Sequence, residues 1–240
     1  FDVTLFSDGS NIQRKPKGHL YLYPLIAIAA MLAIVFVMDL PHMHKPKQQL
    51  SQTIRIPAGQ RAQMDLPDGS VVWLNSQTTL TYDEDFGKKD RKVTLDGEAY
   101  FEVAHNKEIP FYVQTENIKV QVTGTKFDVC SYKGSNSFIA RLIEGSINLL
   151  TNNAKEEKPI TSLTKGKYFS MENGKYKTGE MSSNNALAWM QGIYYFDDVP
   201  FKELLDKIAL YYNYKITVKN PKILENYRCT GKFKDLDGIE

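Results

Sequence analysis

Residues 91–130 have the sequence RKVTLDGEAYFEVAHNKEIPFYVQTENIKVQVTGTKFDVC, which decides the class of the fold. In its first part, apolar or small residues occupy every second position: Val93, Leu95, Gly97, Ala99, Phe101 and Val103. Mostly polar residues stand between them. This period of two is typical of a β-strand with one buried face. The pattern therefore predicts a strand through residues 93–103.

The apolar positions of the same stretch change phase at Gly124-Thr125. Before this pair they have even numbers and after it odd numbers: Ile118, Val120 and Val122, then Phe127 and Val129. Successive side chains of a strand point to opposite faces, so one regular strand cannot contain both sets. We expect a bulge, bend or turn at Gly124-Thr125.

The surrounding residues 53–180 have the same character. Glycines punctuate the region, and several lie in turn-like sequences such as Pro67-Asp68-Gly69-Ser70 and Ile143-Glu144-Gly145-Ser146. No helical period of useful length occurs here. We predict a mainly β region of antiparallel strands, arranged as a sandwich or a roll with solenoid-like stacking as a variant.

From about residue 181 the pattern changes. A short helix is predicted over residues 184–191, and strands are predicted over residues 192–196, 214–218 and 228–233. Between the first two strands, apolar residues follow the spacing of one helix face: Phe201, Leu204, Leu205, Ile208, Ala209 and Tyr212. Pro200 suits the first position of this helix. We predict a small α+β unit with the order β-α-β-β.

An apolar run lies near the start of the chain. Residues 20–38, LYLYPLIAIAAMLAIVFVM, contain no charge. A helix of this length reaches about 28 Å, close to the ~30 Å hydrocarbon core of a bilayer. A buried soluble helix and a cleaved signal peptide are the alternatives, but the run is apolar on every face and no small-x-small cleavage site follows it. We predict a transmembrane helix over residues 19–40, followed by a polar linker over residues 41–52.

Composition excludes several classes of function. The 30 basic and 28 acidic side chains give a net charge of +2, which offers no field for nucleic acid. Two cysteines exclude a disulfide scaffold and a four-thiolate zinc site. Phosphate-binding loops and the common hydrolase motifs do not occur in the sequence. We expect no enzyme activity, no cofactor and no metal, and we expect Cys130 and Cys229 to be unpaired thiols.

Three carboxylates share one face of the predicted strand: Asp96, Glu98 and Glu102. The spacing of ~7 Å between alternate positions resembles the acid pair of an inverting glycosidase. The alternation instead places these side chains on the solvent face of a half-buried strand. We expect a surface or hydrogen-bonding role for them.

Four stretches of the β region resemble the extracytoplasmic β-domain of FecR-type anti-sigma factors in order, spacing and content. They are IPAGQRAQMDLPDGSVVWLNSQTTLTY (56–82), RKVTLDGEAYFEVAHNKEIPFYV (91–113), IKVQVTGTKFDVCSYKG (118–134) and LIEGSINL (142–149). Residues 181–233 resemble the small domain that closes these proteins in the Bacteroidetes branch. That resemblance is carried by Trp189, Gly192, Phe196, Pro200, Leu205, Ile208, Tyr212 and Ile216. The small domain is similar to the short N-terminal signalling domain of secretins and TonB-dependent transporters.

The resemblance implies a single-pass inner-membrane protein. In this family a cytoplasmic N-terminal region binds an ECF sigma factor, and the periplasmic part receives a signal from an outer-membrane transporter. Residues 1–18 would be a remnant of the cytoplasmic region, residues 53–180 the FecR-like β-domain, and residues 181–240 the closing domain. Because the chain starts at Phe1 and ends at Glu240, we expect a fragment in which the sigma-binding region and the second half of the closing domain are incomplete. The alternative function is a membrane-anchored periplasmic module that binds glycan or peptidoglycan.

Two candidate sites follow from the resemblance. Some family members cleave themselves at a Gly-Thr pair in the β-domain, where the Thr hydroxyl attacks the preceding carbonyl. Gly124 and Thr125 could do the same, and a bulge held by these two residues is the alternative. An exposed strand edge at residues 228–233 or 214–218 could pair with the transporter's signalling domain by strand addition. The second of these edges consists of Tyr214, Lys215, Ile216, Thr217 and Val218.

Overall fold

The computed structural model of the chain describes residues 22–39, 50–152, 157–181 and 184–234. The chain divides into two compact units, residues 1–48 and 49–240, and each is described by itself. The predictions for the cytoplasmic segment 1–18 and for most of the linker 41–52 lie outside the described residues.

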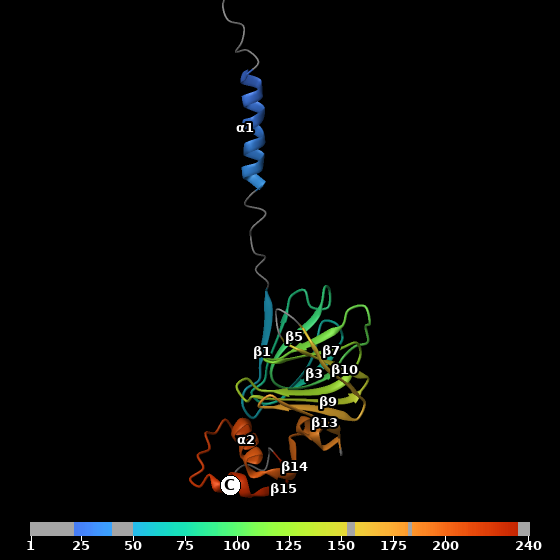
Figure 1. The fold of residues 1–240 in the computed structure, drawn as a ribbon, viewed down its shortest axis with the longest axis vertical. Coiled ribbons are helices and arrows are strands. Elements are labelled where there is room, and N and C mark those ends of the chain that lie inside the picture. Colours follow the sequence, from blue (N-terminus) through green and yellow to red (C-terminus); the bar gives the residue numbers. More distant parts are fainter. Residues whose placement is uncertain (1–21, 40–49, 153–156, 182–183, 235–240) are drawn as a thin grey trace, which may run out of the picture. The chain divides into compact units, whose positions relative to one another are not determined.

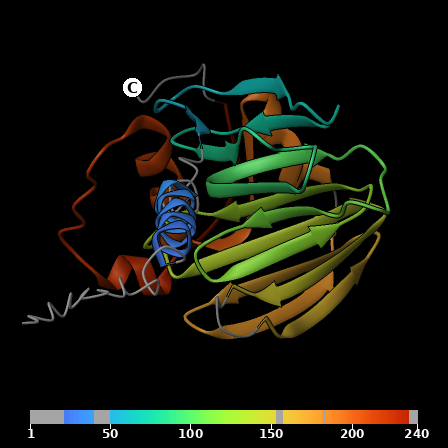
Figure 2. The same cartoon turned by 90° about the horizontal axis from the view of Figure 1, so that it is seen from above.

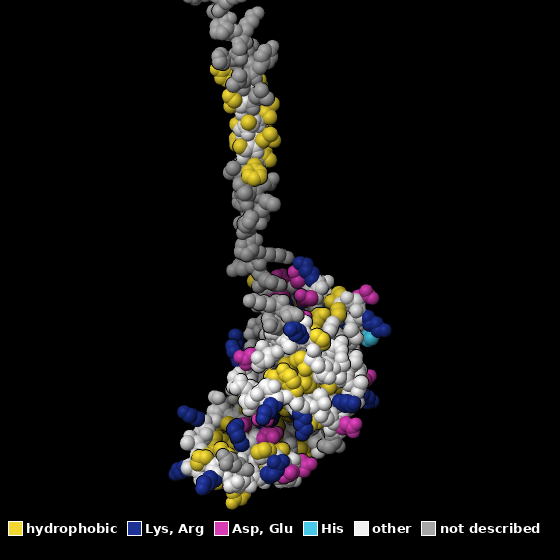
Figure 3. All heavy atoms as spheres, in the orientation of Figure 1, with side chains coloured by type: hydrophobic (Ala, Val, Ile, Leu, Met, Phe, Trp, Pro, Cys, Tyr) yellow, Lys and Arg dark blue, Asp and Glu magenta, His cyan; other side chains and the backbone are white. Residues whose placement is uncertain are grey.

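The first unit contains helix α1 (Leu22–Asp39), which is blue in Figure 1. Figure 3 shows hydrophobic side chains all along this helix. Its large apolar side chains are exposed; Phe36, for example, is 70% exposed and Met31 67%. Of the residues that the structure describes, no helix combines the length and the apolarity that crossing a bilayer requires. The transmembrane helix over residues 19–40 stays a prediction.

The second unit is mainly β, as predicted. Within its described residues, thirteen strands form one continuous hydrogen-bonded sheet that curls on itself (Figures 1 and 2). We call these strands the β-domain. The first seven are β1 (Ser51–Arg55), β2 (Ala62–Asp65), β3 (Val71–Leu74), β4 (Thr79–Asp83), β5 (Arg91–Glu102), β6 (Phe111–Gln114) and β7 (Ile118–Val122). The others are β8 (Lys126–Ser131), β9 (Ser137–Glu144), β10 (Ser146–Thr151), β11 (Pro159–Thr164), β12 (Lys167–Glu172) and β13 (Lys175–Glu180).

Strand β5 belongs to both halves of the curled sheet. Its residues 91–96 pair with β4 and β6 in a first half, which has the order β1-β4-β5-β6-β7-β10-β11. Its residues 97–102 pair with β3 and β8 in a second half, which has the order β2-β3-β5-β8-β9-β12-β13. The two parts meet at Gly97, whose φ of +135° favours glycine. The strand predicted through residues 93–103 is confirmed, and its glycine is the point at which the sheet folds over.

The prediction of purely antiparallel strands was wrong in one place, because β5 and β6 are parallel. A parallel pair normally needs a connection of a dozen residues or more. Here residues 103–110 are enough, because the end of β5 curls back toward its start. The Arg91 guanidinium, at the start of β5, donates hydrogen bonds to the carbonyls of Ala104, Asn106 and Ile109 just after its end.

The change of phase at Gly124-Thr125 is also confirmed. Strand β7 pairs with β6 and β10 in the first half, whereas β8 pairs with β5 and β9 in the second half. The chain therefore changes from one half of the sheet to the other at this pair. The apolar side chains on both sides of the pair point into the same core, in which Val122 and Phe127 are buried.

The remaining elements form a small unit that we call the closing unit. It consists of the 3₁₀ helix η2 (Asn184–Gln191), strand β14 (Ile193–Pro200), helix α2 (Phe201–Tyr212), helix α3 (Lys222–Asn226) and strand β15 (Arg228–Lys234). Strands β14 and β15 pair antiparallel. Pro200 ends β14 and caps α2 with φ −56° and ψ 139°, so it stands one residue before the predicted helix position.

The strand predicted over residues 214–218 was wrong. Helix α2 ends at Asn213 in the left-handed conformation, and the following residues are irregular. Among the described residues, the sheet of the closing unit contains β14 and β15 alone, so residues 214–218 have no partner strand. Tyr214 is 59% exposed and Ile216 38% exposed, so their alternating pattern buries little apolar surface. The observed order is β-α-α-β.

Candidate functional site

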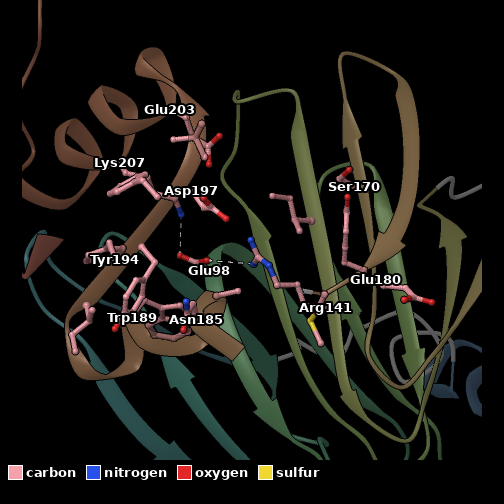
Figure 4. A pocket seen from close by; sticks show the side chains of 18 residues that line it. Glu98, Arg141, Ser170, Glu180, Asn185, Trp189, Tyr194, Asp197, Glu203 and Lys207 are labelled. Carbon is pink, nitrogen blue, oxygen red and sulfur yellow. Dashed lines mark hydrogen bonds and ion pairs between the residues drawn. The ribbon is translucent and has the colours of Figure 1, made fainter. Parts of the chain in front are cut away.

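The closing unit meets the second half of the sheet around a cleft of about 480 Å³ (Figure 4). Charged side chains from both parts line the cleft: Glu98, Arg141, Glu180, Asp197, Glu203 and Lys207. In Figure 4, Glu98 lies between Lys207 and Arg141 and is joined to each by a dashed line. Charged side chains that are far apart in the sequence therefore meet where the two parts touch.

Glu98 is the central residue of this contact. It follows Gly97 on β5, and its side chain is 3% exposed. Its Oε2 accepts a hydrogen bond of 2.7 Å from Asn75 Nδ2 and lies 3.3 Å from Lys207 Nζ of α2. Its Oε1 lies 3.8 Å from Nη1 of Arg141 on β9. The buried carboxylate is thus compensated by two cations and an amide.

Glu98 has the expected hydrogen-bonding role, but the expectation that it faces solvent was wrong. The alternation along β5 correctly placed Glu98 on the face opposite the apolar core, but η2, β14 and α2 lie on the second half of the sheet and bury it. The pattern of one strand does not show which residues of a later segment pack on its polar face. Asp96 and Glu102 are half-buried, and Asp96 accepts a hydrogen bond from the Lys133 backbone N–H.

Asp128 forms the second half of the network. It lies on β8 and is fully buried. Its Oδ2 is 2.6 Å from Arg141 Nη1, and its Oδ1 accepts a hydrogen bond of 3.2 Å from Trp189 Nε1. Trp189 belongs to η2 and is 2% exposed. We call Glu98, Asp128, Arg141 and Lys207 the charge network; Asn75 and Trp189 hydrogen-bond to its carboxylates.

Burial and ion pairing oppose each other in this network. Burial tends to raise the pKa of Glu98, but Lys207, Arg141 and the Asn75 hydrogen bond together hold that pKa below its ordinary value. For Asp128 burial prevails over Arg141 and raises the pKa to about 6. The pKa of Lys207 lies above its ordinary value because Glu98 outweighs the effect of burial. At neutral pH the network therefore holds two positive and two negative charges.

Further hydrogen bonds between the closing unit and the β-domain surround the charge network. The hydroxyl of Tyr211 on α2 donates to the Gly59 carbonyl over 2.9 Å. The Gln77 amide donates to the Leu210 carbonyl, and the Tyr194 hydroxyl donates to Asn75 Oδ1 over 3.2 Å. These contacts fix α2 and β14 against two turns of the β-domain, the one between β1 and β2 and the one that follows β3. Asn75 joins them to Glu98.

The predicted self-cleavage pair lies elsewhere, between β7 and β8. A Cβ placed on Gly124 would lie 2.4 Å from His105 Nδ1, so the imidazole packs directly against this glycine. Thr125 is buried, and its hydroxyl donates to the Ser146 carbonyl over 3.1 Å. The sequence shows no obvious base beside the pair, whereas the fold brings His105 there. Self-cleavage at this pair stays a prediction.

The predicted partner-binding residues Tyr214 to Val218 lie between α2 and α3 and are not part of the charge network. Tyr214 stacks on Tyr212 with ring centroids 5.8 Å apart and an angle of 16° between the rings. The other candidate edge, β15, pairs with β14 and with no further strand among the described residues. Both segments present exposed side chains, which is compatible with contact to a partner.

Sequence reasoning missed Lys207 and its role. It lies outside the apolar positions predicted for the helix over residues 201–212, so the local pattern describes a solvated lysine. Its partner Glu98 is 109 residues away. No local signal in the sequence identifies such a pair.

Within the described ranges, no group of three or more His, Cys, Asp or Glu side chains is arranged to hold a metal ion. Cys130 and Cys229 are free thiols. Burial raises the pKa of Cys130 to about 12, which suppresses its thiolate.

Comparison with known proteins identifies two family models on this chain. The model described as FecR protein matches residues 52–148, and the model described as FecR, C-terminal matches residues 193–240. These matches coincide with most of the β-domain and with the segment that starts at β14. No curated protein matches the chain.

Two crystal structures of a candidate anti-sigma factor from Parabacteroides distasonis ATCC 8503 are similar to the chain. The first has a TM-score of 0.68 and 26% identity, and the match covers 78% of this chain and 85% of that chain. The second has a TM-score of 0.68 and 25% identity, and the match covers 77% of this chain and 85% of that chain. With the two family models, they show that the chain belongs to the FecR-type anti-sigma factors, which regulate sigma factors.

Proposed function

We propose that this sigma regulator is anchored in the inner membrane by residues 19–40. In this proposal the N-terminal side lies in the cytoplasm and residues 41–240 lie in the periplasm. Support comes from the uncharged run 20–38 and from the exposure of the large apolar side chains described in α1. Exposed apolar surface of this kind is costly in water and favourable in lipid.

The proposed activity is a relay by protein contact. An outer-membrane TonB-dependent transporter would signal to the periplasmic part, which would pass the signal to an ECF sigma factor in the cytoplasm. The observation that carries the proposal is the buried charge network, because it ties the closing unit to the β-domain. A partner that binds the closing unit can bias the β-domain only through contacts that differ between two states, and the network supplies such contacts.

The proposed docking site for the transporter's signalling domain is strand β15. Within the part of the chain that the structure describes, one edge of β15 pairs with no strand; such an edge can accept a strand from a partner, with main-chain hydrogen bonds providing affinity. Residues 214–218 are irregular, so they offer side-chain contacts and not a strand edge. The exposed Tyr214 and Tyr227, at 59% and 62%, provide apolar contact on the same unit.

The alternative of a glycan-binding module has less support. Sugar platforms need an exposed aromatic face. Trp189 lines the cleft but is 2% exposed, and its indole N–H is already bonded to Asp128. Tyr195, which lines the same cleft and is 42% exposed, is the aromatic side chain there that a sugar could contact. Binding of peptidoglycan fragments by the purified protein would favour this alternative.

Site-specific photo-crosslinking in cells tests the docking site. A photoreactive amino acid replaces Lys232 on β15 of the full-length protein, and the matched control replaces Tyr176, which is 58% exposed on the edge strand β13. We expect position 232 to crosslink to the transporter when inducer is present, and position 176 not to do so. Induction with no transporter crosslink at position 232 would overturn the proposed docking site.

A further inference from the structure

The β-domain and the closing unit have separate apolar cores. The buried cluster that fills the β-domain lies entirely between Ile56 and Met171 and includes no residue of the closing unit. The closing unit has its own aromatic cluster, in which Tyr194 contacts Tyr211 and Phe233 at centroid distances of 5.7 and 6.1 Å. The main chain connects the two parts once, between β13 and η2. The closing unit can therefore leave the β-domain without opening the core of that domain.

The contact between the two parts is selective for charge. Without the closing unit, the polar face of the β-domain would present Glu98 and Asp128 against one cation, Arg141. Lys207 brings the missing positive charge. The acidic residues Asp197 and Glu203 of the closing unit line the same cleft as Glu98. Burial strengthens the attraction between Lys207 and Glu98.

We propose that Lys207 and Glu98 form a latch that holds the closing unit on the β-domain and that opens when a partner protein engages the closing unit. The opening by a partner rests on the function proposed above. The latch itself is a property of this chain and can be measured without a sigma factor or a transporter. In the open state the polar face of the second sheet half becomes accessible to solvent.

Cys130 reports this opening. It lies on β8 two residues after Asp128, on the same face, and it is the direct strand partner of Glu98. In the closed state Cys130 is half-buried, and burial raises the pKa of its thiol to about 12. Cys229 on β15 is a second free thiol in the same chain. It serves as an internal reference, because β15 belongs to the closing unit itself.

The test compares alkylation rates of the two thiols in the full chain in detergent micelles. Iodoacetamide is added at pH 8, and mass spectrometry follows each cysteine. The main variant is Lys207→Met, and Lys207→Arg is the conservative variant. The matched control is Lys202→Met on the same helix, because Lys202 pairs with Asp206 at the surface, where both side chains are 62% exposed.

We expect Cys130 of Lys207→Met to react at least tenfold faster than in the wild type, with Cys229 unchanged. Lys207→Arg and Lys202→Met should react at nearly the wild-type rate. The direction of the change in the Cys130 alkylation rate distinguishes opening from simple loss of charge, because the positive charge of Lys207 lowers the pKa of Cys130. Loss of that charge without opening would therefore slow the reaction.

Two results overturn the latch. The first is a Cys130 rate in Lys207→Met that is equal to or below the wild-type rate. The second is faster alkylation together with faster hydrogen exchange in β6 and β7, because latch opening leaves the β-domain folded. Neither result bears on the sigma factor, so failure of the latch is distinguishable from failure of the proposed function.

Discussion

Arg91 shows how one buried cation organises a turn of the fold. Its side chain is 2% exposed and forms an ion pair of 3.2 Å with Asp68. Its guanidinium also donates to three backbone carbonyls between residues 104 and 109. These bonds hold the loop that connects the end of β5 with β6. The same loop contains His105, which packs against Gly124.

Replacing Arg91 by Met should destabilise the protein strongly. The substitution leaves the Asp68 carboxylate without its cation and three carbonyls without the guanidinium donor, and breaking a buried ion pair in this way costs about 3–5 kcal/mol. Urea unfolding of the full chain in detergent measures the decrease in the free energy of unfolding. Lys92→Met, at the half-buried neighbouring position, is the control and should cost less than about 1 kcal/mol. Equal losses for the two variants would contradict the role assigned to Arg91.

Asp128 should make stability depend on pH in an unusual direction. Its pKa is about 6 in the folded protein and about 3.9 in an unfolded chain. Between these values the folded state binds more protons, so this residue's contribution to the free energy of unfolding falls as pH rises. From pH 4 to pH 7 we expect the wild type to lose about 2 kcal/mol relative to Asp128→Asn. Denaturant unfolding of both proteins at several pH values measures the difference, and a constant difference would refute the assignment.

Thr125 carries the hypothesis of self-cleavage. The fold places its hydroxyl in a buried turn, with His105 against the preceding glycine. If the chain cleaves itself, incubation should yield fragments that end at Gly124 and begin at Thr125. Thr125→Val should abolish cleavage because it keeps the shape and removes the nucleophile. Intact mass spectrometry decides, and wild-type protein that stays whole through long incubation would end the hypothesis.

At the scale of the element, β5 is the strand on which the domain depends. Gly97 adopts φ +135° and lies so close to Thr78 that an added Cβ would be 2.4 Å from its Oγ1 and 2.7 Å from its Cα. The contact with backbone leaves little room for adjustment. The sequence predicted the strand, but the alternation alone does not show that it bends there from one half of the sheet to the other.

Gly97→Ala should cost about 2–4 kcal/mol, since strain at φ > 0 and a steric clash add up. Gly134→Ala is the matched control, because Gly134 has φ +78° but open space around it. We expect the control to cost about 1 kcal/mol. Thermal unfolding followed by circular dichroism gives both values. If Gly97→Ala lowers the free energy of unfolding no more than Gly134→Ala does, the close contact between Gly97 and Thr78 does not contribute to the cost.

Elements with a strong local period were predictable, and those that depend on a distant partner were not. The strand at β5, the break at Gly124-Thr125 and the helix α2 follow from alternation or helical spacing. The run Tyr214–Val218 alternates as well as a strand does, yet no strand lies beside it among the described residues. Strand pairing is a tertiary property, so period alone overpredicts it.

For the molecule as a whole, the sequence did not predict the contact that joins its parts. The two family models match residues 52–148 of the β-domain and residues 193–240, the segment that starts at β14. The charge network draws its residues from β5, β8, β9 and α2, and Glu98 and Lys207 are 109 residues apart. Each residue alone has the pattern of a solvated charge. Only the docked arrangement brings Lys207 to Glu98 and joins the two parts through this network.

Capture of the sigma factor tests the central proposal most directly. The full-length protein, tagged at its C-terminus, is extracted from native membranes in mild detergent, and co-purified proteins are quantified by mass spectrometry. An unrelated single-pass membrane protein with the same tag is the control. The account predicts an ECF sigma factor in near-stoichiometric amount from uninduced cells. Purification of the intact protein from the membrane without any sigma factor would contradict it.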